Sequence, residues 1–187
     1  MTKLEAFVNH YAMWDKIVHD TPHYRQIKEF YPLSHGGRVF HRCYLCQFYE
    51  ADCDKCPLKT CGIGSLYEKF TKYRSPCLAI LIRNIIFKEY KDDEILHKLK
   101  AYCNHYAMWD NIVDNPSDYK KIKLQYISLK DDVLICNCYL CHYYNLSCCI
   151  CPLNYCGKGS VYKKFMTRPT TEKAIEIRDI IFKDNFI

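Results

Sequence analysis

Ten of the fourteen cysteines in this chain lie in two clusters that share one spacing. Each cluster reads Cys-x2-Cys-x6-Cys-x2-Cys-x4-Cys, so it contains two Cys-x2-Cys pairs and one further cysteine. Two such pairs supply four thiolates, which is the ligand set of a tetrahedral structural zinc site. The pattern predicts one Zn²⁺ per cluster and two per chain, with candidate ligands Cys43, Cys46, Cys53, Cys56 and Cys61, and Cys138, Cys141, Cys148, Cys151 and Cys156.

The two clusters belong to a tandem duplication. Residues 1–92 align with residues 96–187 at a constant offset and without a gap, and about 40 of the 92 aligned positions are identical. An unliganded cysteine can be exchanged for another residue, whereas loss of a metal ligand leaves a coordination position open. The duplication therefore predicts two domains and separates the ten retained cysteines from the four that have no cysteine at the matching position, which are Cys77, Cys103, Cys136 and Cys149.

Five thiols per repeat exceed the four ligands of one zinc ion. In the first repeat the favoured ligands are the members of the two pairs, Cys43, Cys46, Cys53 and Cys56. The fifth cysteine, Cys61, either displaces Cys53 from the metal or lies in the second coordination shell. In both cases the predicted site is closed and structural, not catalytic.

Two other metal chemistries fit the same residues. The position two residues before the first cysteine is His41 in one repeat and Cys136 in the other, and both residue types bind zinc. Six candidate ligands per repeat would allow a cluster of two metal ions. Four thiolates also hold iron–sulfur clusters. The single zinc ion is favoured because the spacing of the two pairs suits it most directly.

Several other residues are identical in both repeats and form a second group of candidates, for binding a ligand. Each also has a simpler interpretation: a packed histidine, a serine that caps a helix, or an arginine paired with a carboxylate such as Asp15. The Gly-x-Gly-Ser segment before a helix also resembles a nest of backbone N–H groups for an anion. The candidates are His10, Trp14, Ser65, Tyr67 and Arg83, with their counterparts His105, Trp109, Ser160, Tyr162 and Arg178.

The elements that position these residues are expected to be mainly helices. Thr2 and Glu5 form a capping-box pattern at the start of the first helix, and apolar residues at spacings of three and four continue it toward Pro22. Short strands are expected at 38–40 and 133–135, directly before the cysteines. The predicted fold class is α+β, mostly helical, with two tandem zinc-knuckle units that each read helix–helix–knuckle–helix–helix.

The second half of each repeat is predicted to contain two helices. One begins after the Gly-x-Gly-Ser segment, with the serine as its N-cap. The other carries the apolar pattern that runs from Ala79 to Phe87 in the first repeat. A break near residues 90–93 is expected to separate this helix from the first helix of the second repeat, because Asp92 and Asp93 can cap a new helix there.

Composition limits the classes of protein that fit. Hydrophobic residues make up 49% of the chain, which is typical of a folded protein. No apolar run approaches the roughly 20 residues that span a bilayer, and the N-terminus lacks the apolar core of a signal peptide. We therefore expect a cytoplasmic protein without a membrane partner, with a secreted disulfide framework as the alternative. The net charge of +6 fits an anionic partner and fits ordinary solubility equally well.

Each repeat resembles a type of small Cys-rich protein that is frequent in bacteriophage and prophage genomes. The resemblance departs at Leu66 and Val161, where those proteins often have proline, and in the tandem arrangement. It implies a zinc-binding, phage-type protein in the cytoplasm of a bacterial host cell, and little about mechanism. The matching residues in the first repeat are Trp14, Cys43, Cys46, Cys53, Cys56, Pro57, Leu58, Cys61, Ser65 and Tyr67.

Three classes of function follow from these observations. The favoured one is a non-enzymatic, zinc-stabilised interaction module whose partner is a host protein or a nucleic acid. The alternative is a sponge that sequesters an anionic nucleotide in two repeated pockets, each formed in part by Arg83 or Arg178. An enzyme is the least favoured class, because the sequence contains no recognisable nucleophile with its base and no open metal site.

Overall fold

The computed structural model describes residues 1–34, 43–59, 61–129, 138–144, 150–153, 156 and 159–183. The chain divides into two compact units, Met1–Leu96 (unit 1) and His97–Ile187 (unit 2). This division lies within a few residues of the boundary between the two sequence repeats. Because the units repeat each other, each is described by itself and then compared by residue position.

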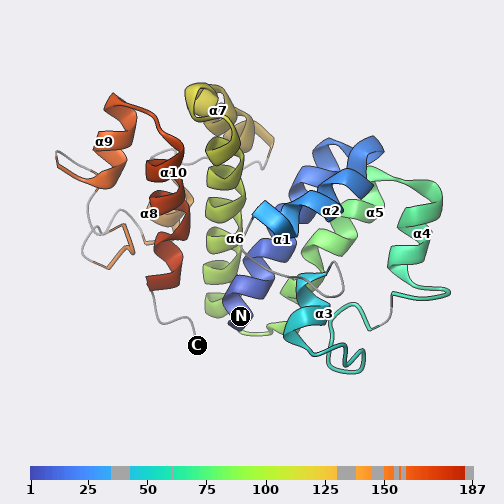
Figure 1. Ribbon diagram of the computed structural model, residues 1–187. Helices are drawn as coiled ribbons and strands as arrows, with labels where there is room; N and C mark the ends of the chain where they lie inside the picture. Colours follow the sequence, from blue (N-terminus) through green and yellow to red (C-terminus); the bar gives the residue numbers. More distant parts are fainter. Residues whose placement is uncertain are drawn as a thin grey trace. The chain divides into compact units, whose positions relative to one another are not determined.

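Unit 1 is built around its first helix, which lies beside α5 in Figure 1. Thr2 forms the predicted capping box with Glu5, so the first backbone N–H groups of this helix are satisfied. The same helix also packs against α2 and α3. The helices of the unit are α1 (Lys3–His19), η1 (Thr21–His23), α2 (Tyr24–Ser34), α3 (Tyr44–Phe48), α4 (Leu66–Tyr73), α5 (Pro76–Arg83) and η2 (Asn84–Glu89).

Unit 2 repeats this order of elements. Asp92 accepts hydrogen bonds from the backbone N–H groups of Glu94 and Ile95, so the predicted break before the second repeat is confirmed and a new helix begins at Asp93. The helices are α6 (Asp93–Asp114), η3 (Pro116–Asp118), α7 (Tyr119–Leu129), α8 (Tyr139–Tyr143), α9 (Val161–Thr167), α10 (Thr171–Arg178) and η4 (Asp179–Lys183).

A tryptophan on the first helix anchors the core of each unit. Trp14 is 1% exposed and meets the ring of Phe70 from α4 edge to face, with the ring centroids 5.1 Å apart. Trp109 meets Phe165 from α9 at the same centroid distance of 5.1 Å. Aromatic pairs in this arrangement add to the free energy gained from burial alone. Both tryptophans therefore fix the helix that follows the cysteine cluster against the first helix of the unit.

The predicted α+β class is wrong. All regular elements among the described residues are helices, with no strand or sheet in that part of the chain. Helix faces supply the core: Ala79, Ile82 and Ile86 are fully buried on the α5–η2 segment that packs against α1. The short strands predicted at 38–40 and 133–135 lie outside the described residues.

Among the described residues the predicted zinc-knuckle units are not found either. The first Cys-x2-Cys pair belongs to a helix start instead of a knuckle turn, since Cys43 is the N-cap of α3 and Cys46 lies within that helix. In unit 2, Cys138 likewise directly precedes α8 and Cys141 lies within it. The order helix–helix–cysteine segment–helix–helix holds, and the last predicted helix continues as a 3-10 turn from Asn84.

No helix among the described residues has the length and the apolar composition needed to cross a lipid bilayer.

Candidate functional site

Three cysteines of unit 1 bring their thiols together beside α1. Cys43 shares a hydrogen bond with Cys46, and Cys46 shares another with Cys61. Cys43 is buried, and the other two are half-buried. The helix α3 supplies two of these thiols, and the segment before α4 supplies the third. Residues that are 18 positions apart in sequence thus form one group, which we call the thiol cluster.

The remaining two cysteines of the pattern, Cys53 and Cys56, differ in burial. Cys56 is buried, accepts a hydrogen bond from the backbone N–H of Leu58, and lies within electrostatic reach of Cys43 and Cys46. Cys53 is exposed. The structure therefore groups Cys61 with the buried thiols and leaves Cys53 at the surface, although spacing favoured Cys53 as the ligand.

Unit 2 repeats the cluster as far as the described residues reach. Cys138 and Cys141 share a hydrogen bond, and both Cys151 and Cys156 lie within electrostatic reach of Cys141. Cys148, the counterpart of the exposed Cys53, lies outside the described residues. His41 and Cys136, which entered the two-metal alternative, also lie outside them, as does the unretained Cys149.

The cysteine pKa values reflect protons shared within each cluster. The hydrogen bond with Cys46, together with burial, raises the pKa of Cys43 to about 12. The hydrogen bond from Cys46 lowers the pKa of Cys61. In unit 2 the thiol with the lowered pKa is the first of the cluster, Cys138, which accepts a hydrogen bond from Cys141. In unit 1 it is the last, Cys61. The common property is that a neighbouring S–H group stabilises one thiolate in each cluster.

A histidine from the first helix lies against each cluster. His10 is fully buried, and its Nε2 lies 2.9 Å from the backbone carbonyl oxygen of Ile82 on α5. The imidazole also lies next to the Cys43 thiol, but no hydrogen bond of acceptable geometry reaches its Nδ1. His105 repeats all three features with Ile177 and Cys138.

No group of three or more His, Cys, Asp or Glu side chains within the described ranges has an arrangement that could hold a metal ion as it stands. The described contacts among the thiols are pairwise, Cys43 with Cys46 and Cys46 with Cys61. A metal site at these cysteines therefore requires the side chains to close around the ion.

A pocket of about 480 Å³ opens beside the thiol cluster in unit 1. Its walls combine aromatic rings, cationic side chains and the three cluster thiols. Small-molecule sites usually have a volume of about 300–1,000 Å³, so the pocket can admit a ligand of that size. The lining residues are Trp14, Tyr24, Tyr67, Arg25, Lys28, Glu29, Leu58, Cys43, Cys46 and Cys61.

Lys28 is the central cation of this pocket. Its ammonium donates a hydrogen bond of 2.9 Å to the Tyr67 hydroxyl and lies 4.2 Å from the centre of the Tyr67 ring. It also lies 5.9 Å from the centre of the Trp14 ring. No carboxylate among the described residues forms an ion pair with Lys28, so hydroxyl and π contacts hold the charge in place.

The contacts of this lysine recur in unit 2. Lys123 is only 7% exposed, and its ammonium lies 2.7 Å from the Tyr162 hydroxyl and 6.0 Å from the Trp109 ring centre. Within the described part of the chain Lys123 also lacks an ion pair with a carboxylate. A lysine that is buried without an anion carries an electrostatic cost, because buried charges are normally paired.

The predicted pairing of Arg83 with Asp15 is confirmed. The guanidinium Nη1 lies 2.6 Å from the Asp15 carboxylate, which is fully buried, and Arg178 repeats the contact with Asp110 at 2.9 Å. Neither arginine contributes to the pocket described above. Arg83 therefore joins α5 to α1, and the prediction that it helps to bind an anionic ligand finds no support in its position.

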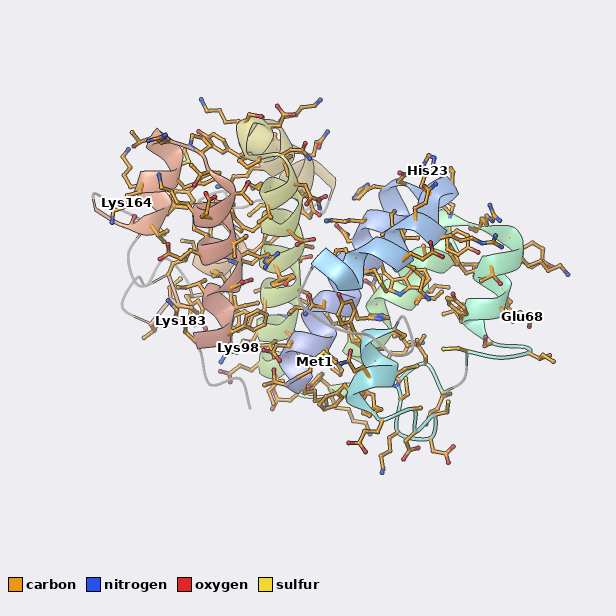
Figure 2. All side chains as sticks on the ribbon, in the orientation of Figure 1. Met1, His23, Glu68, Lys98, Lys164 and Lys183 are labelled. Carbon is orange, nitrogen blue, oxygen red and sulfur yellow. The ribbon has the colours of Figure 1, made fainter. Side chains whose placement is uncertain are left out.

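The serines of the Gly-x-Gly-Ser segments cap helices. Ser65 accepts a hydrogen bond from the backbone N–H of Glu68, and Ser160 accepts one from Lys163. The Glu68 carboxylate, on the side chain labelled in Figure 2, accepts the N–H of Gly64. In unit 1 the Glu68 carboxylate therefore occupies the N–H group of Gly64 that the anion nest would offer to a ligand.

The repeat comparison did not single out every residue of the site. Tyr24 and Lys28 are identical to Tyr119 and Lys123 of the second repeat, and this identity could have marked them as candidate site residues. The contact of Lys28 with Tyr67 spans 39 sequence positions, which no spacing pattern indicates. Of the ten pocket residues, eight are identical in the second repeat, a far higher share than in the repeats as a whole.

No family model, no curated protein and no solved structure matches the chain, so the internal repeat is the comparison on which the site is interpreted.

Proposed function

We propose that each unit is a non-enzymatic binding module, with a structural zinc ion in its thiol cluster and an anionic nucleotide as the ligand of the neighbouring pocket. The observation that carries the proposal is the position of the Lys28 ammonium beside the rings of Trp14 and Tyr67 at the pocket. A cation beside aromatic rings suits a ligand that has both a phosphate and a flat base.

The metal part of the proposal is supported by the contacts among Cys43, Cys46 and Cys61 and by the burial of Cys56. Thiolates are preferred ligands of zinc, and a unit of about 92 residues is small enough to gain from a metal crosslink. Binding would draw the thiols around one centre and release their protons. We expect one zinc ion per unit and two per chain.

The ligand part is supported by the retention of this pocket chemistry. Lys28, Trp14 and Tyr67 recur as Lys123, Trp109 and Tyr162 with nearly the same contacts. A pocket of about 480 Å³ suits a small ligand better than a protein or a nucleic acid, which would need a wider surface. The nucleotide sponge is therefore preferred here to the interaction module that the sequence favoured.

We infer a reducing compartment, the cytoplasm of a bacterial cell, as the setting. All eleven described cysteines are free thiols, and such a compartment keeps thiols available for metal binding.

Titration of the zinc-loaded full chain with nucleotides tests the proposal. The chain has two tryptophans, one beside each lysine, so intrinsic fluorescence reports on both units. Isothermal titration calorimetry then gives affinity and stoichiometry. We expect nucleoside phosphates to bind with two sites per chain, and nucleosides without phosphate to bind much more weakly.

The variant that removes both cations is Lys28→Met combined with Lys123→Met. A hydrogen bond to a charged group contributes about 1.5–3 kcal/mol, so the affinity for nucleotides should fall about 10- to 100-fold. The matched control is Lys69→Met with Lys164→Met, which removes two retained but exposed lysines.

Equal losses in both variants would contradict a specific pocket. A single-stranded oligonucleotide that binds more tightly than any mononucleotide, with a steep dependence on salt, would favour the nucleic-acid alternative. If no nucleotide binds at millimolar concentration, the ligand part of the proposal is wrong even if zinc is present.

A further inference from the structure

The hydrogen bond between His10 and Ile82 defines the state of the imidazole. A backbone carbonyl oxygen only accepts, so Nε2 of His10 must carry the proton that it donates over 2.9 Å. In a neutral imidazole the other nitrogen, Nδ1, is then a bare acceptor. His105 is in the same state, because its Nε2 lies 2.8 Å from the carbonyl oxygen of Ile177.

Nδ1 is the unsatisfied atom of this arrangement. His10 and His105 are both 0% exposed, and neither Nδ1 makes a hydrogen bond of good geometry, although each imidazole lies within reach of one thiol, Cys43 or Cys138. A buried acceptor without a well-formed hydrogen bond destabilises the fold. The same orphaned atom occurs in both units, next to Cys43 in one and Cys138 in the other. A repeated and costly lone pair beside thiols indicates that another group binds there.

We infer that Nδ1 of His10 and Nδ1 of His105 each coordinate the metal ion of their unit, together with three thiolates of the adjacent cluster. This inference rests on the metal part of the proposed function and is independent of the nucleotide. It replaces a site of four cysteines with a mixed site of three cysteines and one histidine.

The contact with Ile82 is the outer-shell bond that such a ligand needs. A histidine that binds a metal donates its other N–H to a carbonyl or carboxylate, which fixes the tautomer and the orientation of the ring. Here the carbonyl belongs to α5 and the ring belongs to α1. The metal would therefore connect the cysteine segment to α1 directly and to α5 through the histidine.

The order of contacts identifies the thiolates. His10 lies against Cys43, Cys43 contacts Cys46, and Cys46 contacts Cys61, so these four groups form a continuous set. Cys56 lies within electrostatic reach of the set but takes its hydrogen bond from the backbone N–H of Leu58, and Cys53 is exposed. In unit 2 the corresponding groups are His105, Cys138, Cys141 and Cys156.

X-ray absorption at the zinc edge of the zinc-loaded full chain tests the ligand set directly. We expect three sulfur neighbours at about 2.3 Å and one nitrogen neighbour at about 2.0–2.1 Å per zinc ion. Four sulfur neighbours and no nitrogen would overturn the inference and leave the zinc ion and the nucleotide pocket in place. Absence of zinc from the protein would overturn both the inference and the metal part of the proposed function, whereas the nucleotide titration judges the pocket separately.

Replacing both histidines by glutamine tests whether they bind the metal or only pack in the core. His10→Gln with His105→Gln retains an amide that can donate to the carbonyl oxygens of Ile82 and Ile177 but removes Nδ1. Since loss of an outer-shell partner already costs about 10- to 100-fold in metal affinity, we expect loss of the ligand to cost at least about 100-fold. Competition with a chromophoric chelator measures this affinity.

The control is His23→Gln, at an exposed histidine that is labelled in Figure 2, and it should leave zinc affinity unchanged. If the His10→Gln, His105→Gln variant folds by circular dichroism and holds two zinc ions with unchanged affinity, the histidines are packing residues and the inference is wrong. If this variant fails to fold, the absorption spectrum of the wild-type protein still decides the question.

Discussion

The ion pair between Arg83 and Asp15 allows a sharp test of how unit 1 is held together. The Asp15 side chain is 0% exposed and that of Arg83 is 13% exposed, so the pair is removed from water. Replacing Arg83 by Met leaves a carboxylate buried without its main counter-charge, which costs about 3–5 kcal/mol in such sites. The second oxygen of Asp15 keeps a polar neighbour, His19 at 3.9 Å, so we expect a loss near 3 kcal/mol, the lower end of the range.

The corresponding arginine of unit 2, Arg178, is expected to contribute more to stability than Arg83. Arg178 binds both Asp110 and Asp179, and the position that matches His19 is Asp114. Burial alone would lower the pKa of Arg178, but the hydrogen bond to Asp179 and the charge of Asp110 raise it overall. Arg178→Met leaves two carboxylates without this partner, and a further carboxylate, Asp114, stands where unit 1 has His19, so we expect a loss near 5 kcal/mol, the upper end of the range.

Urea unfolding of the full chain, followed by tryptophan fluorescence, measures both losses. A Trp109→Phe background restricts the signal to unit 1, and a Trp14→Phe background restricts it to unit 2. With a slope of about 1–3 kcal/mol per molar urea, a loss of 3 kcal/mol lowers the midpoint by at least about 1 M. Lys88→Met, which removes an exposed cation from the same unit, is the control and should shift the midpoint little.

The double variant Asp15→Asn, Arg83→Met, together with the two single variants, forms a double-mutant cycle for this ion pair. It removes the stranded charge, so it should recover part of the stability that Arg83→Met loses. The reasoning is refuted if Arg83→Met behaves like the exposed control, or if the double variant loses the full sum of the two single losses.

Three further predictions concern the core, the helix caps and the thiols. Phe70→Ala should cost about 3–5 kcal/mol in urea unfolding, because Phe70 is 0% exposed and its loss leaves a cavity beside Trp14; a loss below 1 kcal/mol would show that the core refills it. Ser65→Ala should cost about 1 kcal/mol through loss of the N-cap, and Ser65→Asp should restore most of it in the same assay; no difference between the two variants would exclude a capping role. In the metal-free protein, iodoacetamide followed by peptide mass spectrometry should label the exposed Cys53 and Cys77 before the buried Cys103; the reverse order would contradict the described burial.

Local signals in the sequence predicted the elements whose causes lie within a few residues. Thr2 and Glu5 are three positions apart, and the capping box forms as predicted. The helix start at Asp93 follows from the carboxylate of Asp92 in the same way. The pairing of Arg83 with Asp15 was also predictable, because both residues recur in the second repeat and a buried arginine needs an anion.

Features that depend on distant parts of the chain were not predictable in this way. Spacing pairs Cys53 with Cys56, but only the folded chain brings Cys61 to Cys46 and exposes Cys53. The orphaned Nδ1 of His10 depends on the carbonyl of Ile82, 72 positions away. A backbone carbonyl has no residue type, so no sequence pattern could indicate it.

The two ligand sites of the proposed function would not be equal. Glu29 lines the pocket of unit 1 and lies within electrostatic reach of Arg25, whereas the matching residue in unit 2 is Leu124. A carboxylate at the rim repels an anionic ligand, so unit 2 should fill at a lower concentration than unit 1. One chain would then buffer its ligand over two concentration ranges, and a duplicated domain would extend the response range of the protein instead of only doubling its capacity.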